Sequence, residues 1–219
     1  MKVALLLTGL PRKVQEGYDN YWKTIIENYD TDVYLHFWEE EEYEKVLKIY
    51  NPKKYISEKP FKFTEHREGI LSSDIGVKYE WKKYDVADSF RVLPMFYGWQ
   101  SGYQLIEGEY DCVIRSRYDM GSETQIKLEN LDLSKINVSN HHWPNSEIID
   151  DNLCISNKEL SNILFNDLFD EFINFCKTIG TIAEFNEKNF TNILYRKDLY
   201  KHIYKSNELP FQLLRNNQI

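Results

Sequence analysis

Cysteine is scarce in this sequence, and the few cysteines lie far apart. The chain of 219 residues contains three of them, Cys112, Cys154 and Cys176. An odd number of widely separated cysteines argues against a disulfide-stapled scaffold and against a structural zinc site. Because free thiols persist in reducing compartments, we expect a cytoplasmic protein.

Long hydrophobic runs are missing as well. The apolar run from Val3 to Leu7 is too short for a secretory signal and is followed closely by Gly9, Pro11 and Arg12. No apolar stretch approaches the roughly 20 residues that cross a bilayer, so we expect no membrane span. The basic segment 197–207, which contains tyrosines, suits peripheral contact with an anionic membrane, and ordinary solvation is the alternative.

The sequence has no excess of positive charge. Lys and Arg number 27 against 35 Asp and Glu, which gives a net charge of −8, and the basic residues are interspersed with acidic ones. Nucleic acid is therefore not expected as a partner. The P-loop pattern G-x-x-x-x-G-K-[ST] and the G-x-G-x-x-G fingerprint are both absent, so we expect no dinucleotide cofactor.

What is present is an alternation of short apolar runs with amphipathic segments. Strands are expected at 2–8, 32–38, 53–59, 110–118, 135–141 and 152–156, and helices at 14–28, 39–51, 89–108 and from 158 onward. This alternation is typical of an α/β fold, in which helices cover both faces of a mostly parallel sheet. We expect a single domain over 1–219, with an α/β core at 1–157 and a helical C-terminal portion at 158–219.

Two arginines and an aspartate stand at the end of the apolar strand that starts near Tyr110. Arg115 and Arg117 share one face of this strand, and Asp119 follows. Burying an unpaired guanidinium costs at least several kcal/mol, so both arginines need anionic partners. One reading pairs them with acidic residues on packing helices. The other places them at a phosphate-rich ligand, which arginine binds bidentately, while Asp119 holds Mg²⁺, Mn²⁺ or a sugar hydroxyl.

The same stretch, "GYQLIEGEYDCVIRSRYDM", resembles the part of GT-A glycosyltransferases in which a strand leads into a D-x-D motif. The wider chain resembles a WavE-like branch of that superfamily, found in bacteria and large viruses, through "ALLLTGLPR", "TDVYLHFW", "MFYGWQSGYQL" and "IIDDNLCIS". This likeness covers roughly residues 1–160. It implies a GT-A, Rossmann-like fold, a nucleotide-sugar donor, and a glycan or lipid-linked acceptor.

The chain departs from the D-x-D motif at its first position. Arg117 stands there, so only Asp119 remains of the acidic pair. In the family the two carboxylates bind a metal that bridges the donor diphosphate. Here, either Asp119 and the diphosphate hold the metal together, or Arg115 and Arg117 neutralise the diphosphate without one.

Other candidate residues follow the first two expected strands. Gly9 lets the backbone approach a ligand closely, and Arg12 suits a phosphate or a base, whereas a plain turn with a solvated arginine is the alternative. By the resemblance, this loop meets the nucleoside of the donor. Trp38 suits stacking on a base or sugar, and filling of the core is its alternative role.

The segment 140–152 carries a further group of polar side chains. Asp151, and after it Asp150, are candidates for the catalytic base that deprotonates an acceptor hydroxyl, and an Asx turn is the alternative. Trp143 and His142 are candidates for acceptor binding.

These residues favour a glycosyltransferase that moves a sugar from a nucleoside-diphosphate sugar to an acceptor hydroxyl. Two alternatives remain. A nucleotidyltransferase on a similar sheet would bind a nucleoside triphosphate and release pyrophosphate, and a non-catalytic relative would bind a glycan or a partner protein.

Overall fold

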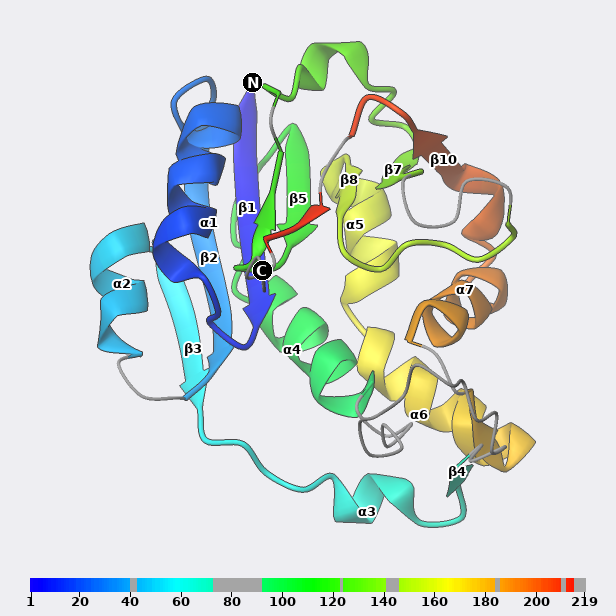
Figure 1. Ribbon diagram of the computed structural model, residues 1–219. Coiled ribbons are helices and arrows are strands. Elements are labelled where there is room, and N and C mark those ends of the chain that lie inside the picture. Colours follow the sequence, from blue (N-terminus) through cyan, green and yellow to red (C-terminus); the bar gives the residue numbers. More distant parts are fainter. Residues whose placement is uncertain are drawn as a thin grey trace, which may run out of the picture.

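A seven-stranded sheet forms the centre of the protein, with strand order β10-β7-β8-β5-β1-β2-β3 (Figure 1). The computed structural model describes residues 1–39, 43–72, 92–122, 124–140, 146–183, 186–209 and 212–214. The strands of the sheet are β1 (Lys2–Gly9), β2 (Asp30–Trp38), β3 (Lys54–Glu58), β5 (Cys112–Ser116), β7 (Ile136–Ser139), β8 (Cys154–Ser156) and β10 (Ile203–Ser206).

The sheet is mostly parallel, which confirms the predicted α/β fold. Strand β8 differs, since it runs antiparallel to both of its neighbours, β5 and β7. Strand β1 lies between β2 and β5 and pairs in parallel with both. Its side chains from Val3 to Leu7 are fully buried, as expected for a strand covered on both faces.

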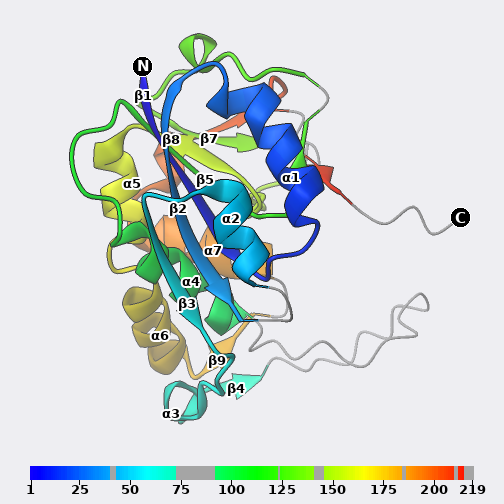
Figure 2. The ribbon, with the colours of Figure 1, turned by 90° about the vertical axis from the view of Figure 1, so that its left-hand side faces the viewer.

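Helices cover both faces of this sheet, and Figures 1 and 2 show the two layers. One face carries α1 (Val14–Tyr21), the π-helix η1 (Trp22–Ile26) and α2 (Glu44–Tyr50). The other carries α4 (Val92–Tyr103), α5 (Lys158–Phe165), α6 (Leu168–Ile179) and α7 (Asn186–Arg196). Alternate residues of β1 enter the two separate apolar cores, because successive side chains of a strand point to opposite faces.

The C-terminal part of the chain is helical as predicted but also returns to the sheet. Strand β10 pairs in parallel with β7 at its edge, and β11 (Gln212–Leu213) pairs with β6 (Met120–Gly121). Residues 158–219 therefore add strands as well as helices. None of the described helices is long and apolar enough to cross a membrane. The remaining short elements are α3 (Thr64–Arg67), β4 (Leu71–Ser72), η3 (Leu128–Asn130), β9 (Thr181–Ile182) and η4 (Tyr200–His202).

A glycine in α1 allows this helix to lie against the chain that leaves β5. A Cβ atom added at Gly17 would lie only 1.9 Å from the carbonyl oxygen of Tyr118. Tyr118 is itself fully buried, and its hydroxyl lies 3.3 Å from the carbonyl oxygens of Leu7 and His36. The segment that carries Arg117 is therefore packed between α1 on one side and the ends of β1 and β2 on the other.

Gly17→Ala is expected to destabilise the fold. Alanine normally stabilises a helix interior by about 1 kcal/mol relative to glycine, but overpacking against the Tyr118 backbone should lower the free energy of unfolding by about 1–3 kcal/mol. Urea denaturation measures this change. Gln15→Ala, at an exposed position of the same helix, is the control and should change stability by less than about 0.5 kcal/mol. A variant as stable as the parent would mean that α1 does not approach Tyr118 this closely.

Candidate functional site

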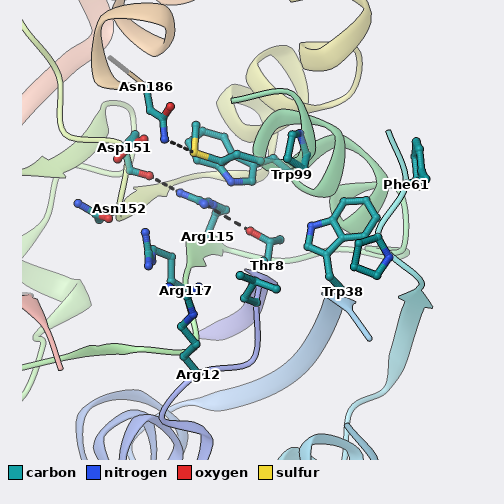
Figure 3. Close-up of a pocket in the computed structure, with 15 residues that line it drawn as sticks. Thr8, Arg12, Trp38, Phe61, Trp99, Arg115, Arg117, Asp151, Asn152 and Asn186 are labelled. Carbon is teal, nitrogen blue, oxygen red and sulfur yellow. Dashed lines mark hydrogen bonds between the residues drawn. The ribbon is translucent and has the colours of Figure 1, made fainter. Parts of the chain in front are cut away.

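A cavity of about 610 Å³ lies at the carboxyl ends of β1, β2 and β5 (Figure 3). Its lining residues are Thr8, Gly9, Leu10, Arg12, Trp38, Pro60, Phe61, Pro94, Met95, Trp99, Arg115, Arg117, Asp151, Asn152 and Asn186. Six of the residues singled out in the sequence are therefore brought together: Gly9, Arg12, Trp38, Arg115, Arg117 and Asp151.

The topology of the sheet explains why these distant segments meet. From β1 the chain moves outward through β2 to β3, and later returns to the other side of β1 as β5. Such a switch point between β1 and β5 is where open α/β sheets bind ligands. Because β8 is antiparallel to β5, the residues that precede β8, including Asp151, lie at the same edge as those that follow β1 and β5.

Arg115 is a buried cation for which the described part of the chain supplies no carboxylate partner. The residue is 1% exposed, and its guanidinium carbon lies 3.3 Å from the centre of the Trp99 ring. Its Nη1 donates to the backbone oxygen of Asp151, and its Nη2 lies 3.3 Å from the hydroxyl of Thr8. Burial lowers the pKa of Arg115 to about 9. Within the described residues no carboxylate forms an ion pair with it, so its charge is only partly compensated.

Other features around Arg115 also favour a negatively charged ligand. Arg115 Nε and Trp99 Nε1 are buried N–H donors without an acceptor in the described part of the chain. Pro94 and Met95, in the first turn of α4, and Asn186, the first residue of α7, line the cavity. Helix N-termini carry partial positive charge and attract anions.

Arg117 and Asp119 form a bidentate ion pair with each other. Arg117 Nε and Nη2 donate to the two carboxylate oxygens of Asp119, at 2.8 and 2.9 Å. Burial lowers the pKa of Arg117, but the hydrogen bond and charge of Asp119 outweigh it and raise the pKa above its ordinary value. The acidic partner of Arg117 thus lies two residues further along the chain, and it is not a residue of a packing helix.

Asp119 does not line the cavity, although Arg117 does. Both of its oxygens already accept from Arg117. Within the described ranges, no three His, Cys, Asp or Glu side chains gather closely enough to hold a metal ion. The assignment of Asp119 to Mg²⁺ or Mn²⁺ stays a prediction, and this arrangement does not favour it.

Asp151 is the acidic residue among the described residues that line the cavity. It is 6% exposed. Burial, and after it the charge of Glu187, raise the pKa of Asp151, while Arg115 opposes them, and the net pKa is about 7 against the ordinary 3.8. A carboxyl group with a pKa near neutrality in a cavity is suited to accept a proton at neutral pH.

Asp150 has a different role. One of its oxygens accepts from the backbone N–H of Asn152 at 2.8 Å and from the Asn152 side-chain amide at 2.7 Å. This is the Asx turn named above as its alternative. Asp150 does not line the cavity, and the turn it forms leads the chain from Asp151 into β8.

Trp38 belongs to an aromatic wall of the cavity. Its ring stacks on Tyr97 at 5.9 Å and meets Phe61 edge-on at 5.5 Å, and Phe61 also lines the cavity. His36 lies on the same side of β2, as predicted, with its ring 5.1 Å from that of Trp38. It does not line the cavity, and its Nε2 lies 2.8 Å from a Glu58 carboxylate oxygen.

The remaining loop residues differ in their surroundings. Gly9 has a positive φ of 107°, a conformation that glycine adopts easily and other residues rarely do. Arg12 is exposed at the cavity rim, and no ion pair is recorded for it within the described residues. Trp143 and His142, the candidates for acceptor binding, lie outside the described residues.

The basic segment 197–207 is largely neutralised by local contacts. Lys197 forms an ion pair with Asp167, and Lys201 forms one with Asp198. Lys205 donates to backbone carbonyl groups. Two of the three lysines are thus paired with carboxylates and Lys205 keeps its charge, and peripheral membrane contact stays a prediction.

Sequence reasoning missed the residues that α4 and α7 bring to the cavity. Trp99 and Asn186 are the clearest cases. The segment around Trp99 was predicted to be helical, but nothing in its pattern indicated that this ring would cover Arg115. The only available signal was the need of a buried arginine for neighbours that stabilise its charge.

Comparisons with known proteins give a distant structural likeness. No protein-family model and no curated protein matches the chain. Among solved structures, it is similar to mouse xyloside xylosyltransferase 1 in the apo form, with 13% sequence identity and a TM-score of 0.46, over 94% of this chain and 85% of that one. A likeness of this degree establishes no shared activity, and the resemblance to the WavE-like branch stays a prediction.

The raised pKa of Asp151 predicts a pH-dependent stability difference between the parent and Asp151→Asn. Between pH 3.8 and about 7 the folded parent keeps the proton that the unfolded chain has lost. Its stability relative to the variant should therefore fall as pH rises through this window, by about 1.4 kcal/mol per pH unit at most, and stay level above it.

Thermal or urea unfolding of both proteins from pH 4 to 8 measures this difference. Asp132→Asn serves as the control, because Asp132 is exposed and hydrogen bonds from Ser134 lower its pKa below 3.8, outside the range that is scanned. Parallel stability curves for the parent and Asp151→Asn would show that Asp151 titrates normally.

Proposed function

We propose that this chain is a glycosyltransferase that moves a sugar from a nucleoside-diphosphate sugar to a hydroxyl of a glycan or lipid-linked acceptor. The observation that carries this proposal is the guanidinium of Arg115. It is buried at the switch point of the sheet, in a cavity that Arg117 also lines, and no carboxylate among the described residues forms an ion pair with it. The WavE-like resemblance and a cytoplasmic location belong to the same proposal.

A diphosphate suits the cationic side of the cavity. The guanidinium groups of Arg115 and Arg117 present planar N–H pairs to phosphate oxygens. The first turns of α4 and α7 add partial positive charge. At about 610 Å³ the cavity falls within the usual range for small-molecule sites, roughly 300–1,000 Å³.

The aromatic wall suits the planar part of such a donor. Trp38 and Phe61 line the cavity beside the loop at Gly9, and a nucleobase stacks favourably on rings of this kind. The absence of a side chain at Gly9 leaves its backbone accessible, since a Cβ there would contact no other atom within 4 Å.

Asp151 is the proposed base of the reaction. Its carboxylate accepts the proton of the acceptor hydroxyl, whose oxygen then forms a bond with the anomeric carbon of the sugar. The bond between that carbon and the diphosphate oxygen breaks, and the electron pair leaves with the nucleoside diphosphate. Arg115 and Arg117 stabilise the charge that develops on this leaving group. A single displacement of this kind inverts the anomeric centre.

Replacement of Arg117 by glutamine should weaken donor binding. We expect the Kd for the nucleoside-diphosphate sugar that binds best among UDP- and GDP-sugars to rise about tenfold or more, because hydrogen bonds to charged groups are lost. Isothermal titration calorimetry measures the change. Arg196→Gln is the matched control, since Arg196 is similarly exposed and pairs with Glu171 outside the cavity.

The same titration separates the alternatives. Tighter binding of nucleoside triphosphates, with release of pyrophosphate, would favour a nucleotidyltransferase instead. If no nucleotide bound to the parent, a non-catalytic role would replace this proposal.

Asp151→Asn should separate catalysis from donor binding. Loss of a general base typically lowers the rate about 10²–10⁴-fold, whereas the Kd for the donor should stay the same or fall, because a negative charge near the diphosphate is removed. Transfer of a radiolabelled sugar and calorimetry give the two values. A variant that transfers sugar at the parental rate would remove Asp151 from the mechanism.

A further inference from the structure

We propose that this chain binds the diphosphate of its donor without a divalent cation, with Asp119 orienting Arg117 rather than holding a metal. The inference rests on the proposed function and specifies how the same site would hold its ligand. Its basis is the arrangement of three side chains, Arg115, Arg117 and Asp119.

The carboxylate of Asp119 is already paired with a positive charge. Each of its oxygens accepts a hydrogen bond from Arg117, in the fork-to-fork geometry that gives strong charge-assisted pairs. A cation at Asp119 would stand beside the Arg117 guanidinium group, whose positive charge would repel it. The Asp119 side chain is 13% exposed and does not reach the cavity lining.

The backbone also holds Asp119 in place. Its carbonyl oxygen accepts a hydrogen bond from the N–H of Leu214 at 2.8 Å, and the next residues, Met120 and Gly121, pair with β11. The backbone that carries Asp119 is therefore held in place, and from it the carboxylate orients Arg117 through the two side-chain hydrogen bonds.

Arg117 can bind a ligand while it keeps this partner. A guanidinium group has five N–H bonds, and Asp119 accepts from only two of them. The Arg117 side chain is 36% exposed and lines the cavity, so its remaining N–H groups are available to a phosphate. The ion pair fixes the plane of the guanidinium group and thereby pre-organises it.

Arg115 supplies the second charge from a fixed position. The Trp99 ring, the Thr8 hydroxyl and the Asp151 backbone oxygen all hold it in place, but none of them carries a negative charge. With Arg12 at the rim, three guanidinium groups stand against two carboxylates, the paired one of Asp119 and that of Asp151, so a positive excess remains even when Asp151 is ionised. This excess attracts the double negative charge of a diphosphate diester, and on this inference it suffices without a divalent cation.

A binding experiment on the full chain tests this inference. UDP- and GDP-sugars are titrated into the protein in EDTA, and then in the presence of Mg²⁺ or Mn²⁺, with binding followed by calorimetry. We expect the same Kd in all three conditions, within about twofold. Binding that occurs only with metal, or becomes at least tenfold tighter with it, would overturn the inference but leave the proposed function intact. Absence of binding in every condition would instead overturn the proposed function.

Asp119→Asn provides the second test. As a positioning residue, Asp119 should affect the Kd in EDTA, which we expect to rise several-fold in the variant and to return toward the parental value in Asp119→Glu. The response of both variants to Mg²⁺ should stay as flat as that of the parent. If the parent bound more tightly with Mg²⁺ and Asp119→Asn lost that gain, Asp119 would be a metal ligand. Asp132→Asn is the matched control, since Asp132 lies outside the cavity, and circular dichroism confirms folding.

Discussion

The burial of one positive charge determines how the site of this protein is built. Arg115 lies near the end of β5, where an apolar residue is usual. It pairs with strands β1 and β8 on either side, and its guanidinium group lies against Trp99 of α4. A guanidinium in such a place is costly unless something compensates its charge. The protein surrounds it with an indole ring, a hydroxyl and a carbonyl oxygen, which stabilise the cation in part. On the proposed function, an anion that enters the cavity would supply the remaining stabilisation, so this part of the energy would favour binding rather than folding.

The pairing of Arg117 with Asp119 restricts the conformational freedom of a second arginine at the same strand end. Arg117 is more exposed than Arg115, so fewer contacts restrict its side chain. A long side chain loses conformational freedom when it binds a ligand. The adjacent carboxylate removes much of that freedom in advance. The two arginines of one motif thus have separate roles, since one is held by the core and the other by a neighbour two residues away.

The local sequence pattern was enough to predict much of the fold, but not which helical residues would line the site. The fully buried run in β1 and the alternation of strands with helices were enough to predict a parallel α/β sheet and to place Gly9, Trp38 and Arg117 at one edge. The direction of β8 was not predictable, because a strand of three residues has the same pattern in either orientation. Trp99 was missed because its contact with Arg115 joins segments whose relative placement depends on packing of the whole domain. The ion pair of Asp119 was missed because the expected strand ran to 118, whereas β5 ends at Ser116 and the chain turns at Tyr118 and Asp119, which brings Asp119 against Arg117.

Because β8 is antiparallel to β5, the position of Asp151 depends on the number of residues between it and the start of β8. Its pairing with β5 places Cys154 opposite Arg115, and Asp151 precedes that pair by three residues. The turn between Asp150 and Asn152 leads directly into β8, so removal or insertion of one residue between Asp151 and Cys154 would shift that turn relative to the sheet. Asp151 would then be displaced from the cavity while the rest of the sheet stayed intact. Natural relatives that retain the chemistry should therefore vary in the length of their outer loops but keep this short spacing constant.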